Sequence, residues 1–290
     1  MNLEMKRNRF FNPRLYVDGL KQLRLIGIMA FVILELEAII VPMSQYISLM
    51  QYQEQGMLRS LGTLNFMEMH PLLCLCFLLF VPIMVLYLFS FLNKRSSSDF
   101  YHALPCSRVC LYNSFMAAVM PWITGVILVT SVTSLIGYTM LSQYCTINMA
   151  SVWTMMFNMF AASLYVAAAV SLAMCLSGTL FTNLVVSFLL IFMPRILITI
   201  FTTYLSNYLY ILSPQHFMPP LDGKYNVATN LVIGIITGNP TATFSYLPGG
   251  IYTLCLGLIF AGLAALAFHR RKSEAAGQSA PNRALQGLYR

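Results

Sequence analysis

The chain has 290 residues, of which 58% are apolar and only 9% are charged, against about 25% charged in an ordinary soluble domain. So few charged side chains cannot cover a soluble protein of this size, whereas a surface that faces lipid needs none. The composition therefore excludes a soluble globular fold and predicts an all-α protein that crosses a membrane several times. A spanning helix takes about 20 residues, so the length allows up to about six or seven spans.

The formal net charge is +8, and the basic residues flank apolar runs instead of forming a separate basic domain. We therefore interpret them as signals of membrane topology, and we expect no nucleic-acid partner. The seven cysteines show no paired framework, so we expect free thiols.

Six apolar runs have the length of a spanning helix: residues 25–43, 72–92, 111–138, 152–176, 180–204 and 247–268. The first run contains Glu35 and Glu37 and lacks the pattern of a signal peptide, so we expect a retained helix. Pro82, Pro121 and Pro194 lie inside runs, where neighbouring helices can satisfy the carbonyls that proline frees. The stretch Val227–Thr237 is apolar but too short to cross, which predicts a segment that dips into the membrane and returns.

The basic residues also predict the orientation, because segments that face the cytoplasm retain Lys and Arg. With the N-terminus inside, fourteen of the seventeen Lys and Arg residues fall on the cytoplasmic side. Arg59 and Lys224 would lie outside, and Arg195 within the membrane. We therefore expect six transmembrane helices with both chain ends in the cytoplasm, organised as a tail with an interfacial helix (1–24), a transmembrane domain (25–268) and a basic tail (269–290).

The segment before the first run has helical features of its own. Asn12 is suited to an N-cap and Pro13 to the first helical position. Tyr16 and Leu20 then fall on one face, and charged residues on another, which predicts a short helix on the inner membrane surface. The alternative is a basic flank that merely anchors the first span.

Motifs for catalysis are missing from the sequence, which contains no P-loop, no H-E-x-x-H, no G-x-S-x-G and no paired C-x-x-C. His102, Cys106 and Cys110 have the spacing of a metal-binding helix face, but Pro105 interrupts that helix, so we expect no metal site. We accordingly expect neither enzymatic activity nor a bound cofactor in this chain.

The loop between the second and third runs is the most informative segment. Ser98 or Asp99 is expected to cap a single helical turn that Pro105 stops, and Ser107 to cap the next span. The turn would present four side chains to the cytoplasm as anchors for a protein partner: Phe100, Tyr101, His102 and Leu104. A loop packed against its own helices would have much the same sequence.

The string Ser-Ser-Asp-Phe-Tyr-His-Ala-Leu-Pro at residues 97–105, followed by Ser107 and Arg108, resembles the first cytoplasmic loop of membrane subunits in the ABC-2 class of ABC transporters, especially permeases of Gram-positive bacteria. The tail at 268–277 is similar to the segment after the sixth span in that group. The resemblance implies an exporter of the bacterial plasma membrane. The nineteen Met residues and the many Phe and Tyr residues are compatible with a pocket for an amphipathic, lipid-like or peptide cargo, although the same residue types fill any membrane helix. The resemblance also implies a second permease subunit, identical or different, and two separate ATPase subunits that bind ATP and magnesium.

In that family the surface helix and the loop contact the ATPase. The resemblance therefore implies that these residues couple to it: Tyr16, Leu20, Ser98, Asp99, Phe100, Tyr101, His102, Leu104, Pro105 and Arg108. One alternative is a membrane sensor or scaffold that binds a cytoplasmic partner through the same loop but transports nothing. Another is an intramembrane enzyme that uses Glu35, Glu37 or His70, which the absence of a nucleophile or metal set disfavours.

Charges within the membrane are costly and usually find partners. At about 1.5 Å per residue, Glu37 lies roughly 21 Å into the first span and Arg195 roughly 22 Å into the fifth. The matching depths predict an ion pair between them, with Glu35 as the less favoured partner. The alternative is that the first span ends early and both glutamates reach water.

Small residues recur every four positions in the fourth and sixth runs, where they would let helices approach closely. We expect them to serve packing within one subunit or at a subunit interface. In the fourth run they are Ser163, Ala167, Ser171 and Cys175, and in the sixth run they are Gly257, Ala261 and Ala265.

Overall fold

The computed structural model describes residues 10–54, 62–64, 71–143, 145–208, 225–237 and 247–271. Helices account for nearly all of these residues, as the composition predicts. The elements are α1 (Pro13–Glu54), β1 (Gly62–Leu64), α3 (Pro71–Leu88), the 3₁₀ turn η1 (Ser90–Asn93), α4 (Arg95–His102), α5 (Arg108–Thr139), the 3₁₀ turn η2 (Met140–Gln143), β2 (Cys145–Ile147), α6 (Met149–Leu176), α7 (Leu180–Tyr208), α9 (Val227–Thr237) and α10 (Leu247–Arg270).

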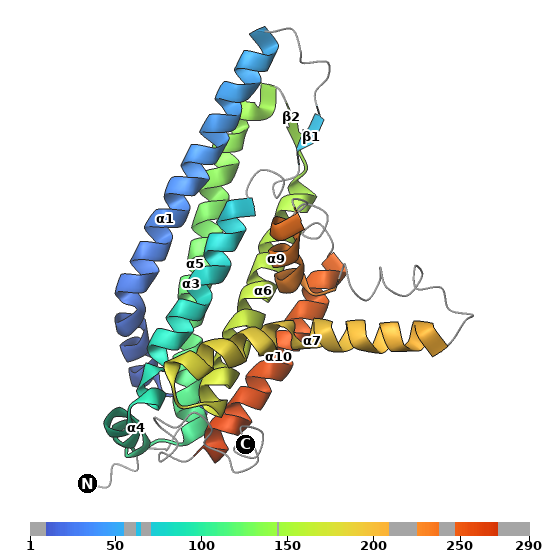
Figure 1. The fold of residues 1–290 in the computed structure, drawn as a ribbon. Coiled ribbons are helices and arrows are strands. Elements are labelled where there is room, and N and C mark those ends of the chain that lie inside the picture. The colour runs from blue at the N-terminus through green and yellow to red at the C-terminus, as the bar shows by residue number, and fades with distance from the viewer. Residues whose placement is uncertain are drawn as a thin grey trace.

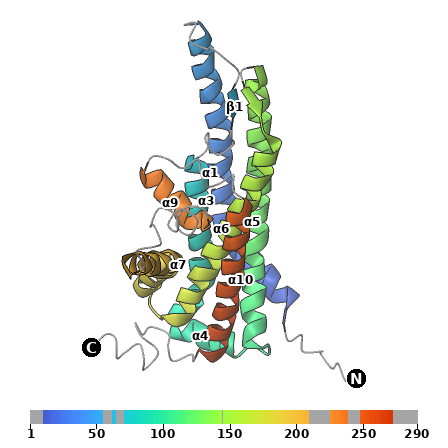
Figure 2. The same ribbon diagram turned by 90° about the vertical axis from the view of Figure 1, so that its right-hand side faces the viewer.

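Five of the helices run side by side as a bundle: α1, α3, α5, α6 and α10 (Figures 1 and 2). The most extensive helix–helix interfaces join α1 to α5 and α6 to α10, and α3 packs against both α1 and α6. The start of α1, the short helix α4 and the end of α10 all lie at one end of the bundle, which we call the α4 end (Figure 1). Those parts of the basic segments that the structure describes, around Arg14, Arg95 and Arg270, are thus brought to one end of the bundle.

Five helices are long and apolar enough to cross a membrane, namely α1, α5 extended to Ser142, α6, the part of α7 up to Phe201, and α10. The expectation of an all-α polytopic membrane protein is therefore confirmed at this level. Helix α3 coincides with the predicted second run but ends at Leu88, because the chain turns there into η1.

The expected interfacial helix is not a separate element. Asn12 caps the start of α1 as predicted, since its Oδ1 accepts a hydrogen bond of 3.0 Å from the backbone N–H of Arg14. The helix then continues for 42 residues to Glu54, so the boundary expected after residue 24 falls inside it. Figure 2 shows the first turns of α1 beside α5 and inclined to the remainder of the helix.

Glycines set the close contacts between α1 and α5. A Cβ atom added at Gly19 would lie 2.9 Å from the Cβ of Ala118, and one at Gly137 would lie 2.8 Å from the Cβ of Pro42. The ring of Trp122 covers Gly27 so closely that any side chain there would collide with it. The close approach of α1 and α5 therefore requires glycine at three positions along the helices.

The small residues of the fourth and sixth runs allow α6 and α10 to pack against each other within one chain. Ser163, Ala167, Ser171 and Cys175 are all buried, and α6 lies against α10 along its length. A Cβ added at Gly257 would lie 3.1 Å from the backbone N and Cα of Tyr165. The helices touch backbone to backbone there, as small-residue stripes predict.

Helix α7 departs from the expected arrangement. Figure 1 shows it crossing the bundle, and Figure 2, turned by 90°, shows it end-on. Very little of its apolar surface is buried, whereas most of α6 is. The fifth run thus has the length and composition of a span without lying parallel to the others.

The carbonyl that the proline inside α7 leaves unpaired receives a hydrogen bond from a neighbouring helix, as expected. Pro194 has no N–H and so frees the carbonyl of Leu190, four residues earlier. The Tyr165 hydroxyl, from α6, donates to that carbonyl at 3.3 Å and to the carbonyl of Ile191 at 2.7 Å.

The segment expected to enter the membrane and return forms α9, whose first residues Val227, Ala228 and Leu231 are buried against α6 and α3. Strands β1 and β2, which the sequence did not predict, pair in parallel with Gly62 opposite Cys145. Parallel pairing follows from the helices before them, since α1 and α5 run in the same direction and end at the same end of the bundle (Figure 1).

Candidate functional site

Helix α4 is longer than the single turn that was expected. It begins at Arg95, one residue after Lys94, which makes no side-chain capping bond. The predicted cap by Ser98 or Asp99 is therefore wrong, because both residues lie within the helix. Ser98 is buried instead, and its Oγ has no hydrogen-bond partner among the described residues.

The end of α4 and the start of α5 agree with the sequence. The helix ends at His102, three residues before Pro105, as a residue preceding proline disfavours helical backbone. Ser107 caps α5, since its Oγ accepts a hydrogen bond of 3.1 Å from the N–H of Cys110. The connection between α4 and α5 is thus short, with the end of α4 before it and the N-cap of α5 after it.

Only one of the four expected anchors points fully away from the bundle. Phe100 is 65% exposed, whereas Tyr101, His102 and Leu104 are partly buried. Adjacent helical positions point about 100° apart, so an outward Phe100 leaves Tyr101 directed sideways into the protein. Packing against the chain's own helices thus accounts for one face of α4, and the other face leaves Phe100 exposed.

Tyr101 fixes the inner face of α4 to three other elements. Its ring centroid lies 4.4 Å from that of Phe91 in η1 and 5.7 Å from that of Phe115 in α5. Its hydroxyl accepts a hydrogen bond of 3.2 Å from the Gln22 side chain in α1. Tyr16 and Leu20, the expected contacts of the first helix, are half-buried in the turns before Gln22.

His102 is enclosed without a hydrogen bond. Neither ring nitrogen has a partner among the described residues, and its ring centroid lies 5.9 Å from that of Phe268 in α10. Burial lowers the pKa of His102, the positive charges of Arg108 and Arg271 lower it further, and Asp99 opposes them. The imidazole is therefore held in its neutral form.

Arg271 occupies the centre of the α4 end, where sequence reasoning had assigned it only a topological role. Its side chain is 5% exposed. Nη2 donates to the carbonyl of Leu92 at 2.9 Å, and Nη1 donates to the carbonyls of Ser177, at 2.8 Å, and of Met174. No part of the sequence pattern distinguishes this arginine from Arg270 beside it.

Arg108 completes this arrangement. Its Nη1 donates to the backbone carbonyls of His269, at 3.3 Å, and of Arg271. We refer to the set as the Arg271 junction: Leu92, Arg108, Met174, Ser177, His269 and Arg271. The resemblance had implied that Arg108 contacts a partner protein, and here it contacts the end of α10.

The start of α7 is attached to the same end. The Asn183 Nδ2 donates to the Asn93 Oδ1 at 2.9 Å, and the Ser177 hydroxyl donates to the Asn183 Oδ1. Asn183 thereby joins the α6–α7 connection to Asn93, the last residue of η1.

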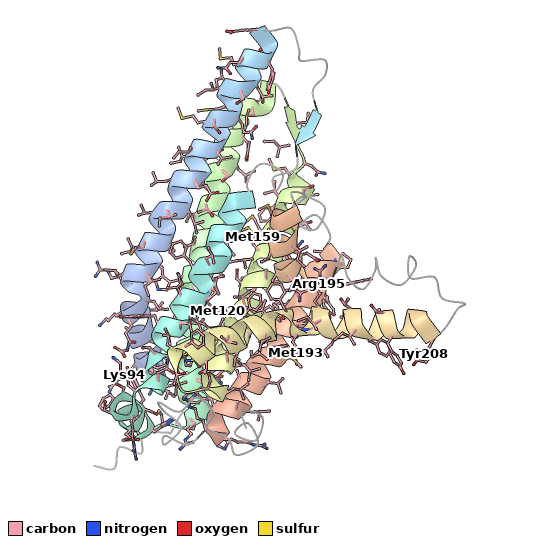
Figure 3. The ribbon with its side chains drawn as sticks, viewed as in Figure 1. Lys94, Met120, Met159, Met193, Arg195 and Tyr208 are labelled. Carbon is pink, nitrogen blue, oxygen red and sulfur yellow. The ribbon has the colours of Figure 1, made fainter. Side chains whose placement is uncertain are left out.

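The expected intramembrane ion pair is not formed. Arg195 donates to the Oδ1 of Asn230 in α9 at 2.6 Å, and Figure 3 shows it away from α1. The Oε1 atoms of Glu35 and Glu37 are buried without a hydrogen-bond partner among the described residues. Matching depth was insufficient, because α1 and α7 lie on different sides of the bundle.

Across the described ranges, no three His, Cys, Asp or Glu side chains gather as a metal site. The thiols of Cys110, Cys175 and Cys255 are free. The hydrogen bonds and ring contacts described above connect several helices at the α4 end.

No family model, curated protein or solved structure matches this chain.

Proposed function

We propose that the chain is the membrane permease subunit of an ATP-driven exporter of the ABC-2 class in the bacterial plasma membrane. A separate subunit hydrolyses ATP and docks on α4, and the exporter moves an amphipathic, lipid-like or peptide cargo. The observation that carries the proposal is the division of α4 into two faces. Phe100 is 65% exposed on one face, and Tyr101 ties the other to η1, α5 and α1.

An exposed aromatic on a supported helix is the kind of anchor that protein partners use. Because α4 is attached to several helices, a partner that moved α4 would also move the ends of those helices. Coupling of this kind requires two arrangements of the bundle whose balance the partner shifts.

The positions of α6 and α10 support the proposal of six spans. Helix α6 ends at the α4 end, where the Ser177 carbonyl meets Arg271, whereas α10 begins away from that end and runs back towards it (Figure 1). The proposal therefore includes a return crossing by the chain between them. Helix α7 is the long apolar helix within that stretch, and we assign the fifth crossing to it.

The test compares two exposed aromatics, one in α4 and one at the start of α6. The tagged chain is purified from its native membranes, and ATP hydrolysis by the purified complex is measured. Phe100→Ala is expected to remove the associated ATPase activity, since loss of a central aromatic anchor typically costs about 2 kcal/mol or more, or roughly 30-fold in affinity. Trp153→Ala, at a residue 68% exposed at the start of α6, is the matched control and is expected to keep it.

If the wild-type chain binds a cytoplasmic protein that does not hydrolyse ATP, the sensor or scaffold is the correct function. If Phe100→Ala and wild type carry equal ATPase activity, α4 is not the docking element.

A further inference from the structure

Arg271 joins parts of the chain that are distant in sequence. Through its guanidinium it contacts Leu92, 179 residues earlier, and Ser177, 94 residues earlier. Leu92 lies in η1, directly before α4, and Ser177 follows the last turn of α6. Through its backbone carbonyl Arg271 also accepts a bond from Arg108, the first residue of α5.

The chemistry of the junction explains why an arginine occupies this position. The last carbonyls of a helix lack intrahelical partners and carry partial negative charge. Met174 and Ser177 supply such carbonyls at the end of α6, and a guanidinium can reach several acceptors at once with its planar set of donors. No carboxylate among the described residues pairs with Arg271, so its charge is balanced by peptide dipoles.

The junction is a polar connection between the residues before α4 and the tightly packed pair α6 and α10, and it lies beside the bonds that Asn183 makes with Asn93 and Ser177. Tyr101 connects α4 to α1 and α5. Arg271, which directly follows α10, connects Leu92 in η1 to Ser177 at the end of α6. At Gly257 these two helices touch backbone to backbone, so they are expected to move as one body. His102 adds only an apolar ring contact with Phe268.

We infer that Arg271 is a positioning residue that transmits displacement of α4 to the α6–α10 pair. The inference rests on the proposed function, in which a partner ATPase displaces α4. It requires that Arg271 can be altered without loss of ATPase docking, because the docking face of α4 carries Phe100 on the other side.

The first experiment measures the connection in the full chain alone. Spin labels are placed at Ser96 in α4 and Leu266 in α10, both exposed, in a background without other cysteines. Arg271→Met is expected to broaden the distance distribution between the labels. Arg271→Lys, which keeps the charge but not the fork of donors, is expected to broaden it less. Arg270→Met is the control, since Arg270 is adjacent and exposed, and should leave it unchanged.

The second experiment adds the copurified ATPase with ATP and orthovanadate. A third label is placed at Ser142. In the wild type, the Ser96–Ser142 distance reports on α4 and the Leu266–Ser142 distance reports on α10. Both distances are expected to shift between the nucleotide-free and the trapped state. Arg271→Lys is expected to keep ATPase binding and turnover while the Leu266–Ser142 distance shifts less than in the wild type. A role in stability alone would lower the amount of folded protein without reducing this response.

An unchanged response in both Arg271 variants would overturn the inference, as would equal broadening by Arg270→Met. If Arg271→Met fails to fold, Arg271→Lys decides the outcome. Failure of the proposed function is recognised separately, because the wild-type chain would then bring no ATPase and show no nucleotide response, while the first experiment would still report on the junction.

Discussion

Adjacent residues of one type have different roles at the end of α10. Arg270 is exposed and Arg271 is buried, although both are basic residues after an apolar run. The topology rule counts them equally, because it concerns only the side of the membrane on which a charge remains. Burial at the meeting point of several helix ends is what gives Arg271 its contacts.

At the same end, His102 predicts a pH dependence of stability. Its pKa in the folded protein is lowered by burial and by Arg108 and Arg271, against the opposing charge of Asp99. A lowered folded pKa means that the stabilisation is fully present above the ordinary value of about 6.5 and is lost as the pH falls below it through the folded pKa. Purified wild-type protein in detergent is therefore expected to melt at a lower temperature at pH 5.5 than at pH 7.5.

The comparison variant is His102→Gln, which cannot take up the proton. Its melting temperature should fall less between the two pH values. If both proteins lose the same number of degrees, other groups titrate and His102 is not responsible.

At the scale of elements, the contact between α6 and α10 depends on one glycine of α10 and not on another. A side chain at Gly257 meets the backbone of Tyr165, whereas nothing lies within 4 Å of a Cβ at Gly262. Gly257→Leu is expected to destabilise the protein by about 1–3 kcal/mol, because the helices must separate. Gly262→Leu is expected to be neutral or stabilising, since leucine has the higher helix propensity by about 1 kcal/mol.

Thermal unfolding in detergent, followed by circular dichroism, checks this difference. The pair is well matched because both substitutions lie in α10 and add the same side chain. A Gly262→Leu variant as unstable as Gly257→Leu would show that the open side of α10 is covered by something else.

At the scale of the whole molecule, the placement of α4 and η2 at opposite ends of the bundle predicts opposite sides of the membrane (Figure 1). Ser96 in α4 and Ser142 in η2 are both exposed. In a background without native cysteines, Ser142→Cys should react with an impermeant maleimide in intact cells. Ser96→Cys should react only after the cells are opened, because the basic residues near α4 are retained inside. Labelling of position 96 from outside would reverse the topology.

Several features were determined by the sequence alone. The low charge and the apolar runs predict the helices, since a lipid-facing surface excludes most charged residues whatever the tertiary structure. Asn12 and Ser107 cap the helices that they precede, because capping involves only neighbouring backbone groups. The small residues of α6 and α10 also predict close helix contact, because they leave the backbone open to whichever helix lies beside them.

Contacts between distant segments were decided only by the tertiary structure. Residue counts along parallel spans predict matching depths for Glu37 and Arg195, but α7 runs crosswise and Arg195 bonds to Asn230 in α9. The inward turn of Tyr101, the crosswise course of α7 and the burial of Arg271 likewise depend on which helices are neighbours. Sequence periodicity gives each helix its faces, but the choice of partner for each face is a property of the packed bundle, because many apolar helices present equivalent surfaces to one another.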